Sequence, residues 1–293
     1  MYELIRVSDT CCYMEAPAKV GFVLGEDGRA YLIDSGNDKD AGKKILRHLQ
    51  ANGWELAAIC NTHSHADHIG GNQYLQQQTG CQIFASGIEA DFTKHPVLEP
   101  AFLYGGYPPR DLQHKFLMAK ESRVELLEEA ALPMPFTVVP MPGHSFDMVG
   151  FRTKDDVVFA ADALSTKETL DKYAIGFLYD VGAYLQTLEA LKNTSAKLFV
   201  PSHAPATENI APLAQYNIDR VLSVADTVAS LCSEPISFEV LLQKLFDRYQ
   251  LAMNFTQYAL VGSTVRSYLS WLSEKGAVEA FVQDNLLLWK RKV

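Results

Sequence analysis

Three histidines and an aspartate lie within six residues of one another, in the segment 61–71 that reads NTHSHADHIGG. They are His63, His65, Asp67 and His68. Imidazole nitrogens and carboxylate oxygens are ligands that Zn²⁺ accepts. In an extended segment His63 and His65 project from one face, because side chains alternate with period two. The chain has only eight histidines, so this concentration predicts a metal site rather than core or surface histidines.

Further ligands are expected where three later apolar runs end. His144 follows the run 136–141, Asp162 follows 157–160, and His203 follows 198–200. Loops after buried strands present functional groups from a rigid scaffold. Each of these residues alone would be an ordinary turn residue, but with the first cluster they predict one shared site.

The elements that must position these residues alternate along the first two hundred residues. Apolar, β-rich runs predict strands at 3–7, 20–24, 30–33, 58–61, 82–85, 136–139, 149–152, 157–161 and 198–200. Helical periodicity predicts helices at 39–51, 72–78 and 181–191. Interleaved strands and helices place helices on sheet faces, in an α/β fold. Turn signals at 25–28 and 154–156 predict antiparallel hairpins, so the sheets should be mixed.

The C-terminal third of the sequence has a different pattern. Helices are predicted over 213–228, 238–249 and 261–272, followed by a small hairpin over 277–289. Three helices and a hairpin resemble a winged-helix module, so we expect a catalytic domain at 1–208 and a winged-helix-like module at 209–293. Basic and acidic residues balance in this module, which favours a packing, pocket-wall or homodimer role over a nucleic-acid face.

Composition narrows the class of protein further. With 48% hydrophobic and 21% charged residues the chain is typical of globular proteins, and its net charge of −9 disfavours a protein that coats nucleic acid. Five cysteines without CxxC spacing indicate free buried thiols in a reducing compartment. No run approaches the roughly 20 apolar residues that cross a bilayer, and no secretory signal is apparent. The expected location is the cytoplasm, with no membrane partner.

The histidine pattern resembles that of the metallo-β-lactamase superfamily, in which HxHxDH is followed by separate His, Asp and His positions. The resemblance covers residues 1–205 and implies an αββα sandwich with two Zn²⁺, for which Fe or Mn are alternatives. It implies a first zinc site of His63, His65 and His144, a second of Asp67, His68 and His203, and Asp162 bridging both. The motif Asp34-Ser35-Gly36 also matches, and there Asp34 is expected to hold a ligand or the loop rather than bind metal.

These residues predict hydrolysis by a metal-bridging hydroxide. Two divalent ions about 3.5–4 Å apart lower the pKa of a shared water from about 15.7 toward 7. Asp67 is the expected catalytic residue, orienting this nucleophile and taking up its proton. No GxSxG motif indicates a serine nucleophile.

The substrate is less determined than the chemistry. The segments THSHADHIGG and GHS resemble the glyoxalase II branch, which implies a small ester, thioester or related acyl substrate. A lactonase acting on acyl lactones and an endoribonuclease or phosphodiesterase stay open as alternatives. A β-lactamase ranks last because residues 145–147 offer no cation for a substrate carboxylate. A structural metal site or an iron redox protein is the non-enzyme alternative. His65 argues against the redox branch, which usually has glutamate there.

Two insertions, 94–120 and 165–180, are rich in aromatic residues and contain a few cations. We expect them to form a lid over the metals. The candidate substrate residues are Tyr104, Tyr107, Arg110, Lys172 and Tyr173. The alternative, in which these aromatics only pin long loops to the surface, stays open.

Overall fold

A computed structural model describes residues 2–130 and 134–292. Its first sheet has seven strands that neighbour one another in chain order. They are β1 (Leu4–Arg6), β2 (Cys11–Met14), β3 (Val20–Leu24), β4 (Ala30–Ile33), β5 (Leu56–Cys60), β6 (Gln82–Ala85) and β7 (Glu125–Leu126). Strands β1 to β4 pair antiparallel, whereas β4 to β7 pair parallel. The predicted mixed sheet is therefore present, and β2 and β7 are strands that the sequence did not indicate.

The second sheet has four strands in the order β11-β10-β9-β8. They are β8 (Phe136–Pro140), β9 (Val149–Thr153), β10 (Val157–Phe159) and β11 (Leu198–Val200). The two sheets face each other, because one buried cluster joins Tyr31 and Phe84 of the first sheet to Phe151 and Phe159 of the second. Both predicted hairpins, β3–β4 and β9–β10, are antiparallel.

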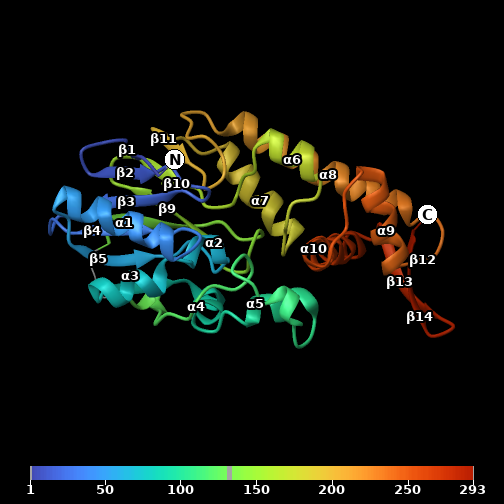
Figure 1. The fold of residues 1–293 in the computed structure, drawn as a ribbon. Coiled ribbons are helices and arrows are strands. Elements are labelled where there is room, and N and C mark those ends of the chain that lie inside the picture. The colour runs from blue at the N-terminus through green and yellow to red at the C-terminus, as the bar shows by residue number, and fades with distance from the viewer. Residues whose placement is uncertain (1, 131–133, 293) are drawn as a thin grey trace.

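Helices cover the outer faces of both sheets (Figure 1). On the first sheet, α1 (Lys39–Asn52) and α3 (Asn72–Thr79) bury Ile45 and Leu75 against strand residues. On the second, α7 (Val181–Lys192) buries Leu188 in a cluster with Phe199. Asp38 caps α1 by accepting two backbone N–H bonds, and the helix ends at Gly53 with φ 67°. The four layers confirm the predicted αββα sandwich.

The C-terminal region consists of helices and a small third sheet in the order β12-β14-β13. Its elements are α8 (Ala211–Leu231), β12 (Ile236–Ser237), α9 (Phe238–Tyr249), α10 (Phe255–Glu274), β13 (Val278–Gln283) and β14 (Leu286–Arg291). The three predicted helices and the hairpin are present, and β12 adds a short strand. One buried cluster contains Phe199 of the second sheet together with Leu245 of α9 and Leu269 of α10. The C-terminal region thus shares its core with the sandwich.

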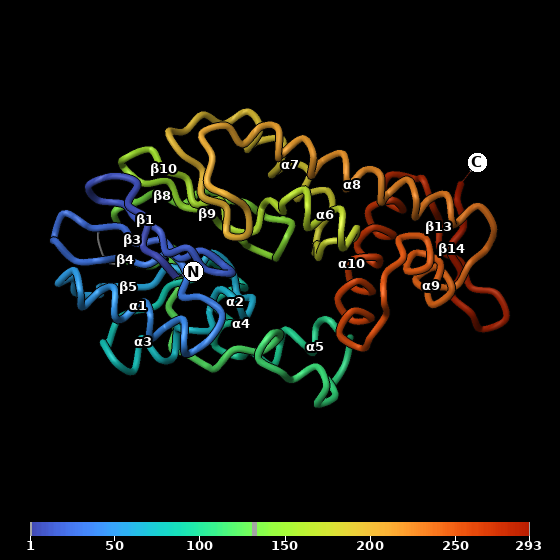
Figure 2. Tube along the Cα trace, turned by 45° about the horizontal axis from the view of Figure 1, so that its top comes forward, coloured from blue at the N-terminus to red at the C-terminus, as the bar shows by residue number. Residues whose placement is uncertain are grey.

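The two insertions and the segments beside the first of them fold into short helices that the sequence analysis left as loops. They are α4 (Gly87–Lys94), α5 (Leu98–Tyr104), the 3₁₀ turns η1 (Arg110–Leu112) and η2 (Leu127–Glu129), and α6 (Lys167–Tyr173). Both α5 and η1 pack against α10, so the first insertion touches the C-terminal region (Figure 2). Leu103, Leu112 and Leu117 form a small buried cluster with Ala259 of α10.

Two further expectations concern the whole chain. The five cysteines are free and buried, as predicted. Within residues 2–130 and 134–292, no helix is both long enough and apolar enough to cross a membrane.

Candidate metal centre and its hollow

All seven predicted ligands lie together at one edge of the sandwich. His63 and His65 follow β5, while Asp67 and His68 lie on the short helix α2 (Ala66–Ile69). The other three follow the ends of β8, β10 and β11 and are His144, Asp162 and His203. The side chains form three groups, and within each group the ligand atoms lie within 4.8 Å of one another. The groups are His63, His65 and His144; His63, His68 and Asp162; and Asp67, His68 and His203.

The first group presents three imidazole nitrogens to one point. His65 Nδ1 lies 3.0 Å from His63 Nε2 and 3.1 Å from His144 Nε2. Burial lowers the pKa of His65 and of His144 to about 4, and it lowers the pKa of His63 well below its usual value. These imidazoles are therefore neutral, which is the form that binds metal.

The second and third groups meet at the Asp162 carboxylate. Asp162 Oδ1 lies 3.1 Å from His68 Nε2, and Asp162 Oδ2 lies 3.2 Å from His203 Nε2. His203 Nε2 also lies 3.1 Å from Asp67 Oδ2. The negative charge of Asp162 raises the pKa of His203 to about 10 and, with the other carboxylates, raises that of His68 against the effect of burial. Without a metal ion, protons on His203 and His68 balance the negative charge of the carboxylates, and a bound cation would balance the same charge.

These side chains fit a pair of metal ions. Two of the buried polar atoms, His68 Nε2 and Asp162 Oδ1, make no hydrogen bond of acceptable geometry although they lie close together. Buried polar atoms without partners carry a free-energy cost that a bound cation would remove. A donor set of imidazoles and carboxylates, free of thiolate, is the chemistry of zinc and of other borderline metals.

Asp34 holds the backbone and one ligand in place. Its carboxylate accepts 2.8 Å hydrogen bonds from the Thr62 backbone N–H and the Thr62 hydroxyl, and it lies 2.8 Å from His68 Nδ1. The contact fixes which His68 nitrogen faces the metal centre. Asp34 itself has φ 63°, a left-handed conformation that costs free energy outside glycine.

Glu89 is a functional candidate that the sequence analysis missed. It is 0% exposed, and it accepts hydrogen bonds from the Ser64 N–H at 2.9 Å and the Ser64 hydroxyl at 2.6 Å. Its second oxygen accepts from the Ser145 hydroxyl at 2.6 Å and the Asp147 N–H at 3.1 Å. Glu89 therefore ties the loop of His63 and His65 to the loop of His144. One signal was available: a serine directly follows a ligand histidine in both loops.

Glu99 on α5 is a second buried carboxyl beside the centre. Its Oε1 lies 3.6 Å from His65 Nε2, the ring nitrogen that faces away from the other ligands. Burial raises the pKa of Glu99 to about 8, with further contributions from Glu89 and Asp67. The first insertion thus brings a carboxyl group to the metal centre, and nothing in the sequence pattern distinguishes it from a surface acid.

A hollow of about 210 Å³ opens beside the ligands. Its lining residues are His65, Ala66, Asp67, Glu99, Phe116, Leu117, His144, Asp162, Phe177 and Leu260. Phe177 comes from the second insertion and Leu260 from α10, so both insertions and the C-terminal region contribute walls. The apolar walls and few polar groups are typical of small-molecule sites.

The five aromatic and basic residues expected in the lid lie elsewhere. Tyr107 is 84% exposed, and Tyr104 packs against Phe255 with ring centroids 6.1 Å apart. Lys172 lies over the ring of its neighbour Tyr173, 4.6 Å from the centroid. Neither these four nor Arg110 belongs to the described lining of the hollow. Both insertions contribute aromatics to the lining of the hollow, but these are Phe116 and Phe177 rather than the residues named from the sequence.

The fold and the site together define a class of protein. Its members are αββα sandwiches with a candidate metal centre of histidines and aspartates at one edge. Residues 18–203 match the family model of the Metallo-beta-lactamase superfamily. The match spans more than half of the chain, and the chain belongs to this superfamily.

Individual relatives are more distant. The chain is 25% identical over 200 residues to an atrochrysone carboxyl ACP thioesterase of Aspergillus fumigatus, covering 68% of this chain and 55% of the relative. It is 28% identical over 181 residues to a hydroxyacylglutathione hydrolase of Methylococcus capsulatus, covering 59% of this chain and 60% of that protein. The chain thus spans somewhat over half the length of these curated relatives.

Two solved structures resemble the fold of nearly the whole chain, including the C-terminal region. A beta-lactamase domain protein from Burkholderia ambifaria superposes with a TM-score of 0.74 at 18% identity, covering 99% of this chain and 94% of that one. A metallo-beta-lactamase family protein from Thermus thermophilus gives a TM-score of 0.71 at 18% identity, covering 99% and 98%. The arrangement of sandwich and C-terminal region therefore recurs in other proteins.

Proposed function

We propose that this protein is a hydrolase with two zinc ions that cleaves a small thioester or a related acyl ester. The observation that carries the proposal is the meeting of all seven candidate ligands at one edge of the sandwich, where His65, Asp67, His144 and Asp162 also line the hollow. The names of two relatives, a hydroxyacylglutathione hydrolase and an ACP thioesterase, support thioester substrates. Fe or Mn are the alternative metals.

The proposed ligand sets follow the three groups of side chains. His63, His65 and His144 would hold one ion. Asp67, His68 and His203 would hold the other, with Asp162 between them. When bound, such a pair polarises the acyl carbonyl and makes water acidic enough to serve as nucleophile near neutral pH.

The remaining steps belong to the side chains of the chain itself. Asp67 lines the hollow and has a partly exposed carboxylate, so it can orient the attacking water and take its proton. Water adds to the acyl carbon, the bond from that carbon to sulfur or oxygen breaks, and the leaving thiol or alcohol carries the proton away. Phe116, Phe177 and Leu260 form an apolar wall that the acyl group can contact.

The C-terminal region contributes to the site in this proposal. We propose residues 1–208 as the catalytic domain and 209–293 as a winged-helix-like module that supplies part of the pocket wall through Leu260. This contact favours a pocket-wall role over nucleic-acid binding or dimer formation. The five buried free thiols support a cytoplasmic location.

The test is a hydrolase panel of thioesters, lactones, phosphodiesters, RNA and β-lactams. The wild type is compared with Asp67→Ala and with Asp91→Ala, a matched control that removes an exposed carboxylate on α4. We expect thioester hydrolysis in the wild type and control, with a loss of at least about a hundredfold in Asp67→Ala. Full activity in Asp67→Ala, or activity only on phosphodiesters, would contradict the proposal.

A further inference from the structure

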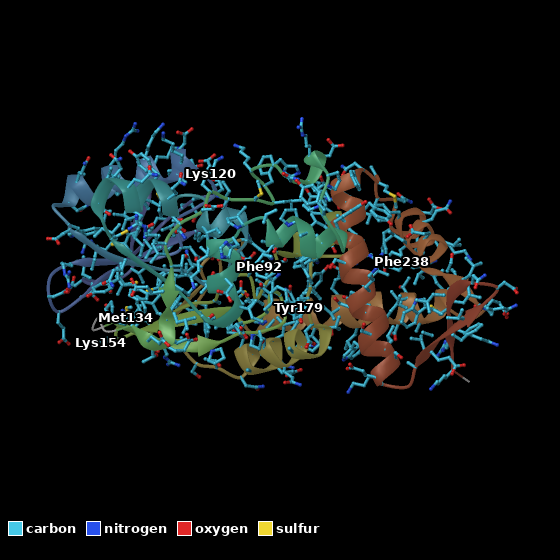
Figure 3. The ribbon with its side chains drawn as sticks, turned by 90° about the horizontal axis from the view of Figure 1, so that it is seen from below. Phe92, Lys120, Met134, Lys154, Tyr179 and Phe238 are labelled. Atoms are coloured by element: carbon cyan, nitrogen blue, oxygen red, sulfur yellow. The ribbon has the colours of Figure 1, made fainter. Side chains whose placement is uncertain are left out.

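A second hollow, of about 410 Å³, lies next to the metal hollow and contains three lysines. We call it the lysine hollow. Its described lining residues are Asn37, Asp38, Lys39, Gly70, Gln73, Tyr74, Gln77, Lys115, Met118, Ala119 and Lys120. Figure 3 shows Lys120 beside the outer helices of the first sheet.

The two hollows are bounded by the same two chain segments. In the segment 66–70, Ala66 and Asp67 line the metal hollow, whereas Gly70 lines the lysine hollow. In the segment 115–118, Phe116 and Leu117 line the metal hollow, whereas Lys115 and Met118 line the lysine hollow. A substrate held at the metal centre could therefore extend one part into the neighbouring hollow.

The lysine hollow carries an excess of positive charge. Lys115 Nζ lies 3.3 Å from Asp38 Oδ2, while Asp38 Oδ1 already accepts the capping bonds of α1. In residues 2–130 and 134–292, Lys39 and Lys120 have no carboxylate within ion-pair distance. Two cations thus stay uncompensated in a protein whose net charge is −9, and such a patch attracts anions.

The uncharged walls suit an extended, partly apolar arm. Tyr74 on α3 contributes its ring, and Lys39 Nζ lies 5.6 Å from the centre of that ring. Met118 and Ala119 add apolar surface. Gln73 ties α3 to the adjoining segment through a 3.1 Å hydrogen bond to the Glu121 carbonyl, so the wall is not a free loop.

We propose that the lysine hollow binds a phosphate-bearing arm on the leaving thiol of the substrate, which rests on the proposed thioester hydrolysis. Lysine binds phosphate as a point charge, and the described lining of the hollow has three lysines against the single carboxylate of Asp38. The corresponding thiol class is 4′-phosphopantetheine, which occurs both in coenzyme A and on acyl carrier proteins. The small metal hollow would hold the acyl group, and the lysine hollow would hold the arm.

The test compares acyl-coenzyme A with acyl-pantetheine, which has the same acyl group and no phosphate. The variant is Lys39→Ala/Lys120→Ala, and the control is Lys244→Ala/Lys275→Ala, which removes two exposed lysines of the C-terminal region. We expect a kcat/KM at least about tenfold higher for acyl-coenzyme A in the wild type and control. In the variant this advantage should shrink to about twofold, with kcat/KM for acyl-pantetheine unchanged. An equal kcat/KM for both substrates in the wild type, or an equal loss on both in the variant, would overturn the proposal.

Two further measurements show whether the phosphate-bearing arm comes from coenzyme A or from a carrier protein, and which of the two proposals fails. A matched acyl carrier protein shows whether the protein-bound arm is preferred over coenzyme A, and a preference for a glutathione thioester over both would overturn the phosphate assignment. Binding of S-propyl-coenzyme A, a thioether that cannot be hydrolysed, is measured by calorimetry. If no thioester is cleaved the proposed function fails, yet lysine-dependent binding of this thioether would still support the lysine hollow. Absent or lysine-independent binding would overturn it.

Discussion

The metal centre and the walls of its hollow are built in different ways. Each ligand follows a strand or lies on the short helix α2, so the strands of the two sheets determine where it points. The walls come from the two insertions and from α10, which are joined to the sandwich mainly by packing between helices. If the proposed function is right, the chemistry depends on the strand ends of the sandwich, and substrate selection depends on the insertions and α10.

The largest effect is expected from the centre itself, on changing Asp162→Ala. His68 Nε2 and His203 Nε2 would lose the carboxylate that lies 3.1–3.2 Å from each. We expect metal content to fall below two ions per chain, and activity to fall by more than about a hundredfold. Elemental analysis and thioester kinetics measure both. Two bound ions with normal kinetics in this variant would show that Asp162 does not join the two groups.

A somewhat smaller effect is expected at Glu89, which joins the two histidine loops. Glu89→Gln replaces one acceptor with a donor facing Ser64 or Ser145, both of which donate to it. We expect zinc affinity to fall about 10–100-fold with KM nearly unchanged, because the loops rather than the walls are disturbed. Chelator competition measures the affinity, and Glu129→Gln on the exposed turn η2 is the control. A change in KM alone would place Glu89 with the walls instead.

Changing Phe177→Ala in the wall should raise KM and leave metal binding unchanged, the reverse of the result expected at Glu89. Its ring centroid lies 5.3 Å from that of His65 and 5.7 Å from that of His144. We expect KM to rise about tenfold while metal content stays at the wild-type value, because buried aromatic area is lost and no ligand is changed. Tyr107→Ala, which removes an aromatic that is 84% exposed, should behave as the wild type. Loss of metal in Phe177→Ala would show that the walls also support metal binding, against the expected separation of the two roles.

The smallest effect is expected at Leu260 on α10. Leu260→Ala shortens the part of the wall that the C-terminal region supplies. We expect KM to rise about two- to fivefold, most for the bulkiest acyl groups, with the loss of buried apolar area as the cause. A series of acyl chain lengths measures the effect. Identical kinetics across the series would show that the C-terminal region takes no part in substrate binding.

The same contrast explains what could be predicted from the sequence. The ligands follow apolar runs, which predicted one shared site, whereas their division into two metal positions was implied by the resemblance to the metallo-β-lactamase superfamily. The strand β2 was missed because its sequence, CCYM, contains no β-branched residue, the type that marks most of the predicted strands. The short helix α5 contains Pro100 and is too brief to show a helical period.

The missed functional residues share one physical cause. Glu89 and Glu99 are acids in helices of eight and seven residues, and their burial depends on tertiary contacts with distant loops. Their local sequence cannot be told from that of a solvated helix face. Likewise, no period decides which aromatic of a long insertion lines the hollow, and therefore Phe116 and Phe177 were not distinguished from Tyr107 and Tyr173.

We expect the seven ligand side chains to hold two zinc ions at the edge of the sandwich. Crystals of the zinc-loaded protein, measured at the zinc absorption edge, test it most directly. Our account predicts two anomalous peaks per chain, one among His63, His65 and His144 and one among Asp67, His68 and His203, with Asp162 contacting both. A single peak, peaks away from these side chains, or iron in the protein as purified would contradict it.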